Sequence, residues 1–455
     1  MKPTLFSDKV GFLSPLSLHE RAVILNFYLS DRKRLTMHTR ITSFIISGFV
    51  LSAASSVAEP GSLTFVESVP AETSLDLSQL EEASVIWPQA IAAAQQSVRV
   101  ASFYFSRIGD GKDAAAPAGI QDHLLPSLDA LSEAAKRGVR VQILADSKFL
   151  KNYSEVPDLF AKTPGAETRI LDANQLWGGV LHAKYMLIDD DTFYVGSQNW
   201  DWRAMDQIHE LGVLVKQPDM ARQLNQVYEM DWELAEGPVS EKAKDKAKDG
   251  ASLFDLPSSA VRTADGSVVQ GLVAASPRQA LPAGVPWDLP LLVEMIDSAS
   301  DSLHLQLLSY GVTDREGRLF DDLDSALRRA AVRKVDVKII LSNWSKSRYK
   351  LPWIKSLAVL PNLEVRFTNI PEHSAGFIPF ARVEHAKYLT VDGQALWIGT
   401  SNWSRDYFHN SRNISLFFLG DGAPGVPDEF FNQSWHSEYA ESVDPAAEYA
   451  PPRRN

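Results

Sequence analysis

The sequence predicts an α/β fold of two similar sandwich lobes, related by a pseudo-twofold axis, with one active site at their interface. Three observations lead to this prediction. Helix-like and strand-like segments alternate along the chain, the same order occurs in both halves, and each half contains one copy of an unusual polar pattern. Alternating helices and strands are typical of a sheet that is covered on both faces by helices. With 455 residues and 45% apolar composition, the chain is long enough for two or three domains.

The first half begins with a predicted helix at Ile86–Gln96, where Pro88 falls in the first turn. Ser97–Phe105 alternates and is rich in β-branched and aromatic residues, so it is predicted to be a strand. A helix at Leu124–Gly138 ends in basic residues and a glycine, and the strand Val139–Asp146 follows. A further short strand, ETRILDA, precedes the polar pattern.

The second half repeats this order. The corresponding predicted elements are a helix at Leu289–Ser302, a strand at Ser302–Tyr310, a helix at Leu323–Lys334, a strand at Val335–Trp344 and a short strand, LEVRFTNI. We therefore expect an N-terminal extension with a signal peptide (1–58), a first lobe (59–235), a charged linker (236–270), a second lobe (271–440) and a disordered tail (441–455). The linker contains KAKDKAKDG, whose interleaved charges favour a solvated spacer over a nucleic-acid contact.

The N-terminus is typical of a secretory signal peptide. A basic stretch precedes an apolar run from Ile41 to Ala54, and a small-x-Ala site ends at Ala58. The apolar run is shorter than the roughly 20 residues of a membrane span. We expect a secreted or periplasmic protein without a stable transmembrane span in its mature chain. Met37 is where such a signal would start, so translation of residues 1–36 is an open question.

Composition excludes several classes of function. The net charge of −12 argues against a protein that coats nucleic acid non-specifically, because such binding needs a broad basic surface. A small basic cleft on an acidic body stays compatible with this charge. The chain has no cysteine, which excludes disulfides, thiol nucleophiles and cysteine-based zinc sites.

The polar pattern reads LHAKYMLIDDDTFYVGSQNW in the first half and EHAKYLTVDGQALWIGTSNW in the second. Six positions match: His182 with His385, Lys184 with Lys387, Asp189 with Asp392, Gly196 with Gly399, Ser197 with Thr400, and Asn199 with Asn402. On a strand, residues two apart lie on one face, so each histidine and its lysine point the same way. The glycine allows a close turn, which would present the hydroxyl and the amide beside them.

Two imidazoles, two ammonium groups and four neutral hydrogen-bonding groups suit a tetrahedral phosphodiester. The lysines would neutralise the non-bridging oxygens, one histidine would attack phosphorus, and the other would protonate the leaving oxygen. Paired histidines also bind zinc readily, but the lysines beside them would repel a cation. We therefore expect a phosphodiesterase with a phosphohistidine intermediate, no metal and no cofactor. A phosphate-binding scaffold without activity is the non-enzyme alternative.

The remaining polar residues are predicted to position the histidines. Asp189 and Asp392 lie five residues beyond the lysines, so on a regular strand they face away and are expected to be structural or orienting. Glu210 is the better candidate for holding an imidazole by its second nitrogen. The corresponding position in the second half is Asn413, so the two histidines are expected to have different roles.

Aromatic residues near the asparagines suggest a substrate. Trp200 and Trp403 follow them directly and are predicted to bind substrate by stacking on bases; core packing is the alternative reading. Other candidates for the mouth of the site are Trp202, Tyr407, Phe408, Trp344 and Tyr349. Single-stranded DNA or RNA is the first expected substrate, and phospholipid, approached through the apolar loop His373–Arg382, is the alternative. No obligate protein partner is inferred.

These residues resemble the phospholipase D superfamily, whose signature H-x-K-x4-D-x6-G-[ST]-x-N occurs here twice, within a similarity from Val66 to Tyr439. DWR after the first asparagine, ELGV, VASFYF and GTSNWSRDYF are similar to the lysosomal phospholipase-D-like five-prime exonucleases of animals. This resemblance implies a single-strand exonuclease in which His182 is the nucleophile and His385 the acid and base. It also implies that Glu210 can act across the pseudo-twofold. Unlike those proteins, which are anchored and contain disulfides, this chain has a predicted cleavable signal and no cysteine.

Overall fold

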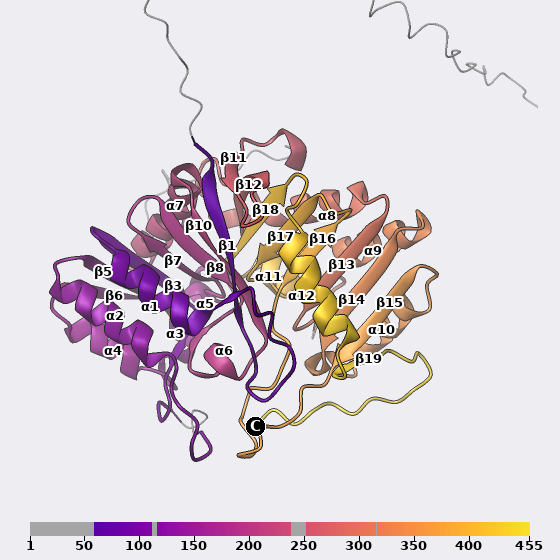
Figure 1. The fold of residues 1–455 in the computed structure, drawn as a ribbon, viewed down its shortest axis with the longest axis horizontal. Helices are drawn as coiled ribbons and strands as arrows, with labels where there is room; N and C mark the ends of the chain where they lie inside the picture. The colour runs from indigo at the N-terminus through magenta and orange to yellow at the C-terminus, as the bar shows by residue number, and fades with distance from the viewer. Residues whose placement is uncertain (1–58, 112–115, 238–251, 315) are drawn as a thin grey trace, which may run out of the picture. The chain divides into compact units, whose positions relative to one another are not determined.

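One mixed sheet of 17 strands runs through the described part of the chain (Figure 1). The structure is a computed structural model that describes residues 59–111, 116–237, 252–314 and 316–455. The predicted signal peptide therefore lies outside the described residues, and secretion stays a prediction. Within the described residues, no helix combines the length and the apolar character that crossing a membrane requires.

Seven strands of the first half pair in the order β6-β5-β3-β7-β8-β10-β1. Their bounds are β1 Gly61–Ser68, β3 Ser97–Ser102, β5 Arg140–Asp146, β6 Ala166–Leu171, β7 Lys184–Ile188, β8 Thr192–Gly196 and β10 Glu210–Lys216. β3, β5 and β6 run parallel, whereas β7, β8 and β10 form an antiparallel meander beside them. The polar pattern thus occupies the meander, next to the parallel strands.

The second half has the same pairing, β15-β14-β13-β16-β17-β18-β12. Its strands are β12 Val268–Ser276, β13 Ser302–Leu307, β14 Asp336–Ser342, β15 Leu363–Thr368, β16 Tyr388–Val391, β17 Ala395–Gly399 and β18 Asn413–Leu419. β11 (Ser259–Arg262) pairs with both β1 and β12 and so joins the halves into one sheet. The predicted α/β duplication is confirmed.

Short strands complete the sheet at its margins. β2 (Glu81–Glu82) pairs with β1, and β19 (Ala440–Ser442) pairs with β15. β4 (Phe105–Ser106) and β9 (Trp200–Asp201) form a separate two-stranded sheet. The predicted strand Ser97–Phe105 is therefore split between β3 and β4.

Helices cover both faces of the sheet, as the alternation in sequence predicts (Figure 1). In the first half they are α1 Ala83–Ala93, α2 Leu125–Lys136, α3 Ser147–Leu150, α4 Glu155–Lys162, α5 Ala173–Trp177, α6 Arg203–Asp206 and α7 Pro218–Leu234. In the second half they are α8 Asp288–Ser298, α9 Asp322–Val332, α10 Leu351–Ala358, α11 Arg405–His409 and α12 Gly425–His436. Three short 3-10 helices, η3 Leu253–Asp255, η4 Arg278–Ala280 and η5 Asn343–Ser345, lie in connections of the described residues.

Sequence patterns explain where individual helices begin and end. α2 buries Leu128, Leu131 and Ala135 at helical spacing, and Gly138 follows with φ +89°, a conformation that stops a helix. α7 begins with Pro218, and the Gln217 side chain accepts hydrogen bonds from the first-turn amides.

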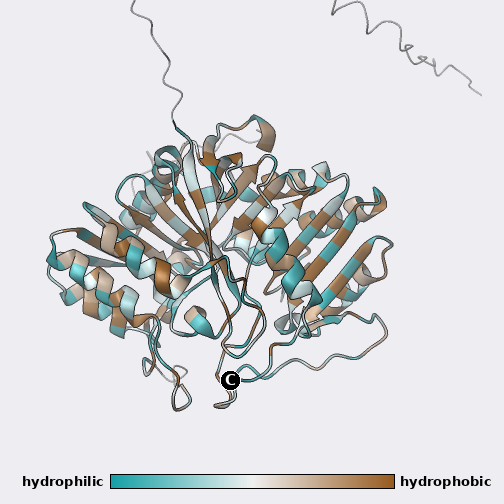
Figure 2. Cartoon of the chain, in the orientation of Figure 1, coloured by the Kyte–Doolittle hydropathy of each residue, from teal (hydrophilic) through white to brown (hydrophobic). Residues whose placement is uncertain are grey.

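Three hydrophobic cores result from this arrangement. One consists of second-lobe residues, one consists mainly of first-lobe residues with Leu308, Ile378 and Val383 added, and the third combines both lobes, including Tyr185 of β7 and Tyr388 of β16. Figure 2 shows hydrophobic residues along the strands and a mixture of hydrophobic and hydrophilic residues on the covering helices. The shared core fixes the two copies of the polar pattern relative to each other.

The connection between the lobes and the C-terminal segment differ from the prediction. The predicted linker, 236–270, contains η3, β11 and the start of β12 in its described part. The tail, 441–455, is not frayed. It contacts the second lobe, where the Tyr449 ring meets Phe367 and the Arg454 guanidinium lies 4.8 Å from the Trp344 ring centroid. Aromatic and cationic side chains anchor a segment that its composition alone marks as solvated.

Candidate active site

The two copies of the polar pattern meet where the lobes cross-connect. Leu181 bridges Arg412 and His209 bridges Glu384 in short parallel pairings between the lobes. The amide of His182 donates to the Arg412 carbonyl at 2.9 Å, and the amide of His385 donates to the His209 carbonyl at 2.8 Å. Each histidine is therefore fixed at its backbone by the opposite lobe.

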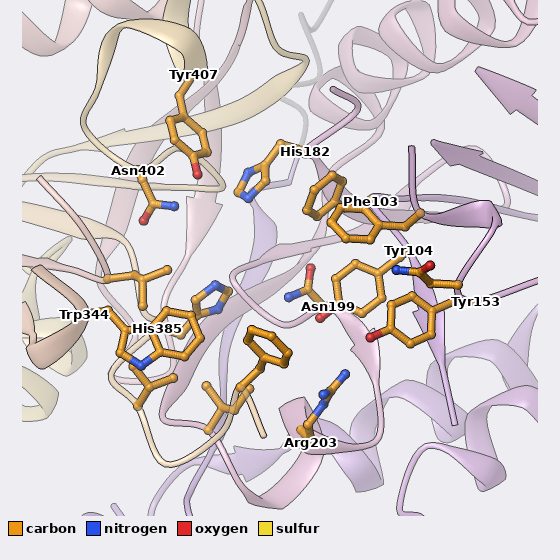
Figure 3. Close-up of a pocket in the computed structure, with 16 residues that line it drawn as sticks. Phe103, Tyr104, Tyr153, His182, Asn199, Arg203, Trp344, His385, Asn402 and Tyr407 are labelled. Carbon is orange, nitrogen blue, oxygen red and sulfur yellow. The ribbon is translucent and has the colours of Figure 1, made fainter. Parts of the chain in front are cut away.

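Both histidines line one cavity of about 270 Å³ (Figure 3). Asn199 and Asn402 line the same cavity, and the Oδ1 atoms of both amides are buried without a partner among the described residues. Buried amide oxygens normally accept a hydrogen bond, so these two can accept one from a donor group of a substrate. The structure thus brings together the two predicted imidazoles and the two predicted amides.

Each imidazole is held by a side chain from the other lobe. His182 Nδ1 lies 3.0 Å from Asn413 Oδ1, and His385 Nδ1 lies 2.7 Å from Glu210 Oε2. The Asn413 amide is oriented by its own contacts, since its Nδ2 donates to the Tyr407 carbonyl. Asn413 Oδ1 can only accept, so His182 Nδ1 donates and Nε2 of His182 is the free, basic nitrogen, whereas Glu210 accepts from His385 Nδ1 when its carboxyl is ionised. Glu210 was predicted to be a positioning residue, and its contact is with the histidine of the second lobe.

The two contacts differ in charge. Asn413 is neutral, whereas Glu210 is a carboxylic acid without exposed surface, and burial raises its pKa to about 7. Burial and the two nearby lysines lower the pKa of both histidines below the usual value. The Glu210–His385 pair can therefore hold a proton that the neutral Asn413–His182 pair releases.

Lys184 and Lys387 are buried and are not among the residues that line the cavity. The Nζ of each donates to the carbonyl of the histidine two residues earlier. Burial lowers the pKa of Lys387 to about 7, and burial together with Lys387 lowers the pKa of Lys184. A bound anion would raise the pKa of both lysines again, because a nearby negative charge favours the protonated form. The pair of lysines is therefore suited to a site that an anionic group occupies.

The hydroxyls of Ser197 and Thr400 were predicted to bind substrate, but neither residue lines the cavity. Ser197 Oγ donates to the Leu211 carbonyl, and Thr400 Oγ1 donates to Asn413 Oδ1 at 2.9 Å. This corrects their assignment, because at the strand end they face the neighbouring strand of the meander. Thr400 instead helps to orient the amide that holds His182.

Asp189 and Asp392 are at turns remote from the cavity. Both have positive φ, and their carboxylates accept hydrogen bonds from backbone amides at the start of β3 and β13. Desolvation by burial raises the pKa of both carboxyls, but these hydrogen bonds together outweigh it, so the pKa of each is lowered. Each aspartate thus fastens a motif turn to a parallel strand.

Trp200 and Trp403 are corrected as substrate-binding residues. Each is only 1% exposed. Trp200 packs on Trp87 at 4.8 Å between ring centroids, and Trp403 packs near Trp397. Proximity to the asparagines in sequence did not place them on the same side of the backbone. Trp202 and Phe408 are likewise buried, and Tyr349 is exposed away from the cavity.

Other aromatic residues form the cavity wall that these tryptophans were predicted to provide. The aromatic wall consists of Phe103, Tyr104, Phe149, Tyr153, Trp344, Phe380 and Tyr407. Trp344 and Tyr407 were predicted to be there, and Phe380 belongs to the loop His373–Arg382, which was predicted to lie near the site. Phe103 and Tyr104 follow β3, and Phe149 follows β5, so the rule that ligands bind beyond the carboxyl ends of parallel strands could have found them. Arg203, in the DWR triplet, also lines the cavity.

Comparisons with known proteins agree with this geometry. A family profile described as "Cardiolipin synthase, PLD-like domain" matches residues 88–232 and again 292–435. The chain is 30% identical to the 5'-3' exonuclease PLD3 of Xenopus laevis over 82% of this chain and 80% of that protein. It is 29% identical to phospholipase D Z of Dictyostelium discoideum over 84% and 90%, respectively. The fold is similar to that of phosphatidylserine synthase from Haemophilus influenzae Rd KW20, with TM-score 0.54 and 11% identity over 79% and 85% of the two chains.

Proposed function

The chain belongs to the family of phospholipase-D-like domains that is described by cardiolipin synthase, and it is a phosphodiesterase of the phospholipase D superfamily. Within this superfamily, we propose that it is a single-strand exonuclease. The reaction uses a phosphohistidine intermediate and two lysines in place of a metal ion. The observation that carries this proposal is the shared cavity, into which opposite lobes each supply one imidazole.

Roles for the histidines follow from their partners. His182, whose Nδ1 contacts the neutral Asn413, stays unprotonated and attacks phosphorus through Nε2. His385, paired with Glu210, donates its proton to the leaving oxygen as the bond to phosphorus breaks. In the second step His385 takes a proton from water, the oxygen of that water attacks phosphorus, and Nε2 of His182 leaves. After one turnover His385 is protonated again and His182 is free again.

The lysines and asparagines support charge development at phosphorus. A phosphodiester gains negative charge on its non-bridging oxygens in the transition state, and fixed cations in a dry site stabilise that charge strongly. The anionic substrate itself keeps Lys184 and Lys387 protonated, since it offsets the burial that lowers their pKa. The Asn199 and Asn402 amides add neutral donors at the cavity wall.

The aromatic wall favours nucleic acid as the substrate. Unpaired bases stack on aromatic side chains, whereas a duplex keeps its bases stacked inside. A cavity of about 270 Å³ is small for the roughly 300–1,000 Å³ of typical ligand sites, which favours one terminal unit of a chain. The relative from Xenopus laevis, which covers most of the chain, is named as an exonuclease.

Phospholipid headgroup hydrolysis is the second candidate. Ile208, Leu308 and Val383 give the same cavity aliphatic surface, and two relatives from Dictyostelium discoideum are named phospholipase D. The test is a parallel assay of end-labelled single-stranded oligonucleotide and labelled phosphatidylcholine vesicles, each with chelator. We expect stepwise shortening of the oligonucleotide at acidic to neutral pH. Intact oligonucleotide together with headgroup release would select the lipid reaction instead.

A further inference from the structure

Three carboxylates gather beside the sheet, away from the catalytic cavity. Glu67 is on β1, Glu82 is on β2 and opposite Glu67 in their parallel pairing, and Asp76 is on the connection between these strands. One oxygen atom from each of the three carboxylates lies within 4.8 Å of the other two. None of these residues lines the cavity.

This acidic cluster lacks a compensating charge. No lysine, arginine or histidine among the described residues forms an ion pair with Glu67, Asp76 or Glu82. Glu67 has no exposed surface, and although its Oε1 accepts a hydrogen bond from the Leu77 amide, its Oε2 is buried without a partner. A buried carboxylate oxygen without a donor, in a residue close to two further carboxylates, is costly unless a cation or a proton occupies the space between them.

Protonation is the competing way to remove this cost. Burial and the neighbouring Glu82 raise the pKa of Glu67 to about 8, and burial with Asp76 raises the pKa of Glu82 to about 7. Protons and a metal ion therefore compete for the same oxygen atoms. Which of them occupies the cluster at neutral pH can be measured.

We propose that Glu67, Asp76 and Glu82 form a calcium site. Calcium takes oxygen ligands at about 2.3–2.6 Å, so oxygens within 4.8 Å of one another are close enough to share one ion. The cluster offers neither histidine nor cysteine, which zinc prefers. Asp76 is exposed, which leaves room for water to complete the coordination shell.

The ion would stabilise a segment of the first lobe that contacts the second lobe. Residues 69–80, the strap, leave the cluster and return to it. Arg382 of the second lobe donates to the Ala71 carbonyl at 2.7 Å, and the Ser374 amide donates to Glu72 Oε2 at 2.8 Å. The same loop of the second lobe carries Phe380, which lines the cavity. Calcium at the base of the strap would therefore stabilise the contact between the lobes beside the active site.

The experiment measures binding and stability, not hydrolysis, so its failure is separate from that of the proposed function. Protein stripped with EGTA is titrated with CaCl2 by calorimetry and heated with or without CaCl2. We expect one calcium ion per chain and a rise in Tm of at least about 3 °C. Glu67→Gln should lose both responses, whereas Glu81→Gln, whose exposed carboxyl is next to the cluster, should keep both.

Three outcomes would overturn the calcium site. The first is wild-type protein that shows neither binding nor a Tm shift. The second is Glu67→Gln that binds calcium as wild type does, which would place the ion elsewhere. The third is a response to MgCl2 alone. If Glu67→Gln does not fold, Glu82→Gln, at the partly exposed edge of the cluster, answers the same question.

Discussion

The two histidines of the cavity differ in the side chain that contacts each Nδ1 atom. Glu210 and Asn413 occupy corresponding positions after the two asparagines, and each contacts the histidine of the opposite lobe. In the proposed mechanism this difference separates the acid from the nucleophile, because a carboxylate stabilises the imidazolium and an amide does not.

Glu210→Gln tests this difference. Without the carboxylate, His385 loses its proton at lower pH, so the alkaline limb of the kcat/KM profile should shift to lower pH. The rate at the optimum should fall by about 10–100-fold. The complementary variant Asn413→Asp gives His182 a carboxylate and should shift the acid limb to higher pH. Profiles that keep their wild-type limbs in both variants would contradict the assigned roles.

Sequence reasoning located the histidines, lysines and asparagines because the repeat keeps them in register while its filler changes. It misplaced Trp200 and Trp403, since adjacency in sequence does not say which side of a turning backbone a side chain occupies. Asn413 was identified as the counterpart of Glu210, but which histidine each of them contacts depends on how the two lobes pack.

Equivalent elements of the two lobes furnish the cavity wall. Phe149 in α3 follows β5, and Trp344 in η5 follows β14, the corresponding parallel strand. Strand and helix order was predictable from periodicity, and with it the carboxyl ends where ligands bind. The connection 236–270 was predicted to be a linker, and its β11 was missed because charged residues precede a strand of only four residues.

Trp344→Ala tests the wall as a stacking surface. Base stacking on an aromatic ring contributes about 1–3 kcal/mol, so KM for single-stranded oligonucleotide should rise by roughly 5–150-fold with little change in kcat. Trp344→Phe keeps a ring and serves as the control. Equal KM values for the alanine and phenylalanine variants would argue against stacking at this position.

At the scale of the whole molecule, one sheet and one shared core hold the two copies of the polar pattern together. Arg412, which directly precedes Asn413, forms a fully buried ion pair with Asp231 of α7, with N–O distances of 2.7 and 2.8 Å. Duplication was predictable from the repeat, but the continuity of the sheet through β1, β11 and β12 was not, because no local pattern encodes pairing between distant strands.

Arg412→Ala should destabilise the protein strongly. Removing one partner of a buried pair leaves the other charge uncompensated and costs about 3–5 kcal/mol in the free energy of unfolding. Chemical denaturation measures this loss. Arg222→Ala, which breaks an exposed pair with Asp219, should change the free energy by less than about 1 kcal/mol. If Arg412→Ala lowered the free energy of unfolding as little as Arg222→Ala does, the role of the Arg412–Asp231 pair in joining the lobes would be contradicted.

The most direct test traps the covalent intermediate. An aryl phosphodiester needs no acid to expel its leaving group, so His385→Ala protein, mixed with bis(p-nitrophenyl) phosphate in chelator, should become phosphorylated but hydrolyse the adduct slowly. Attack expels one p-nitrophenolate and leaves the other on phosphorus, so peptide mass spectrometry should find a p-nitrophenyl phosphoryl group on His182. An adduct on another residue, or aryl release without any adduct in this variant, would contradict nucleophilic attack by His182 with His385 as its acid and base.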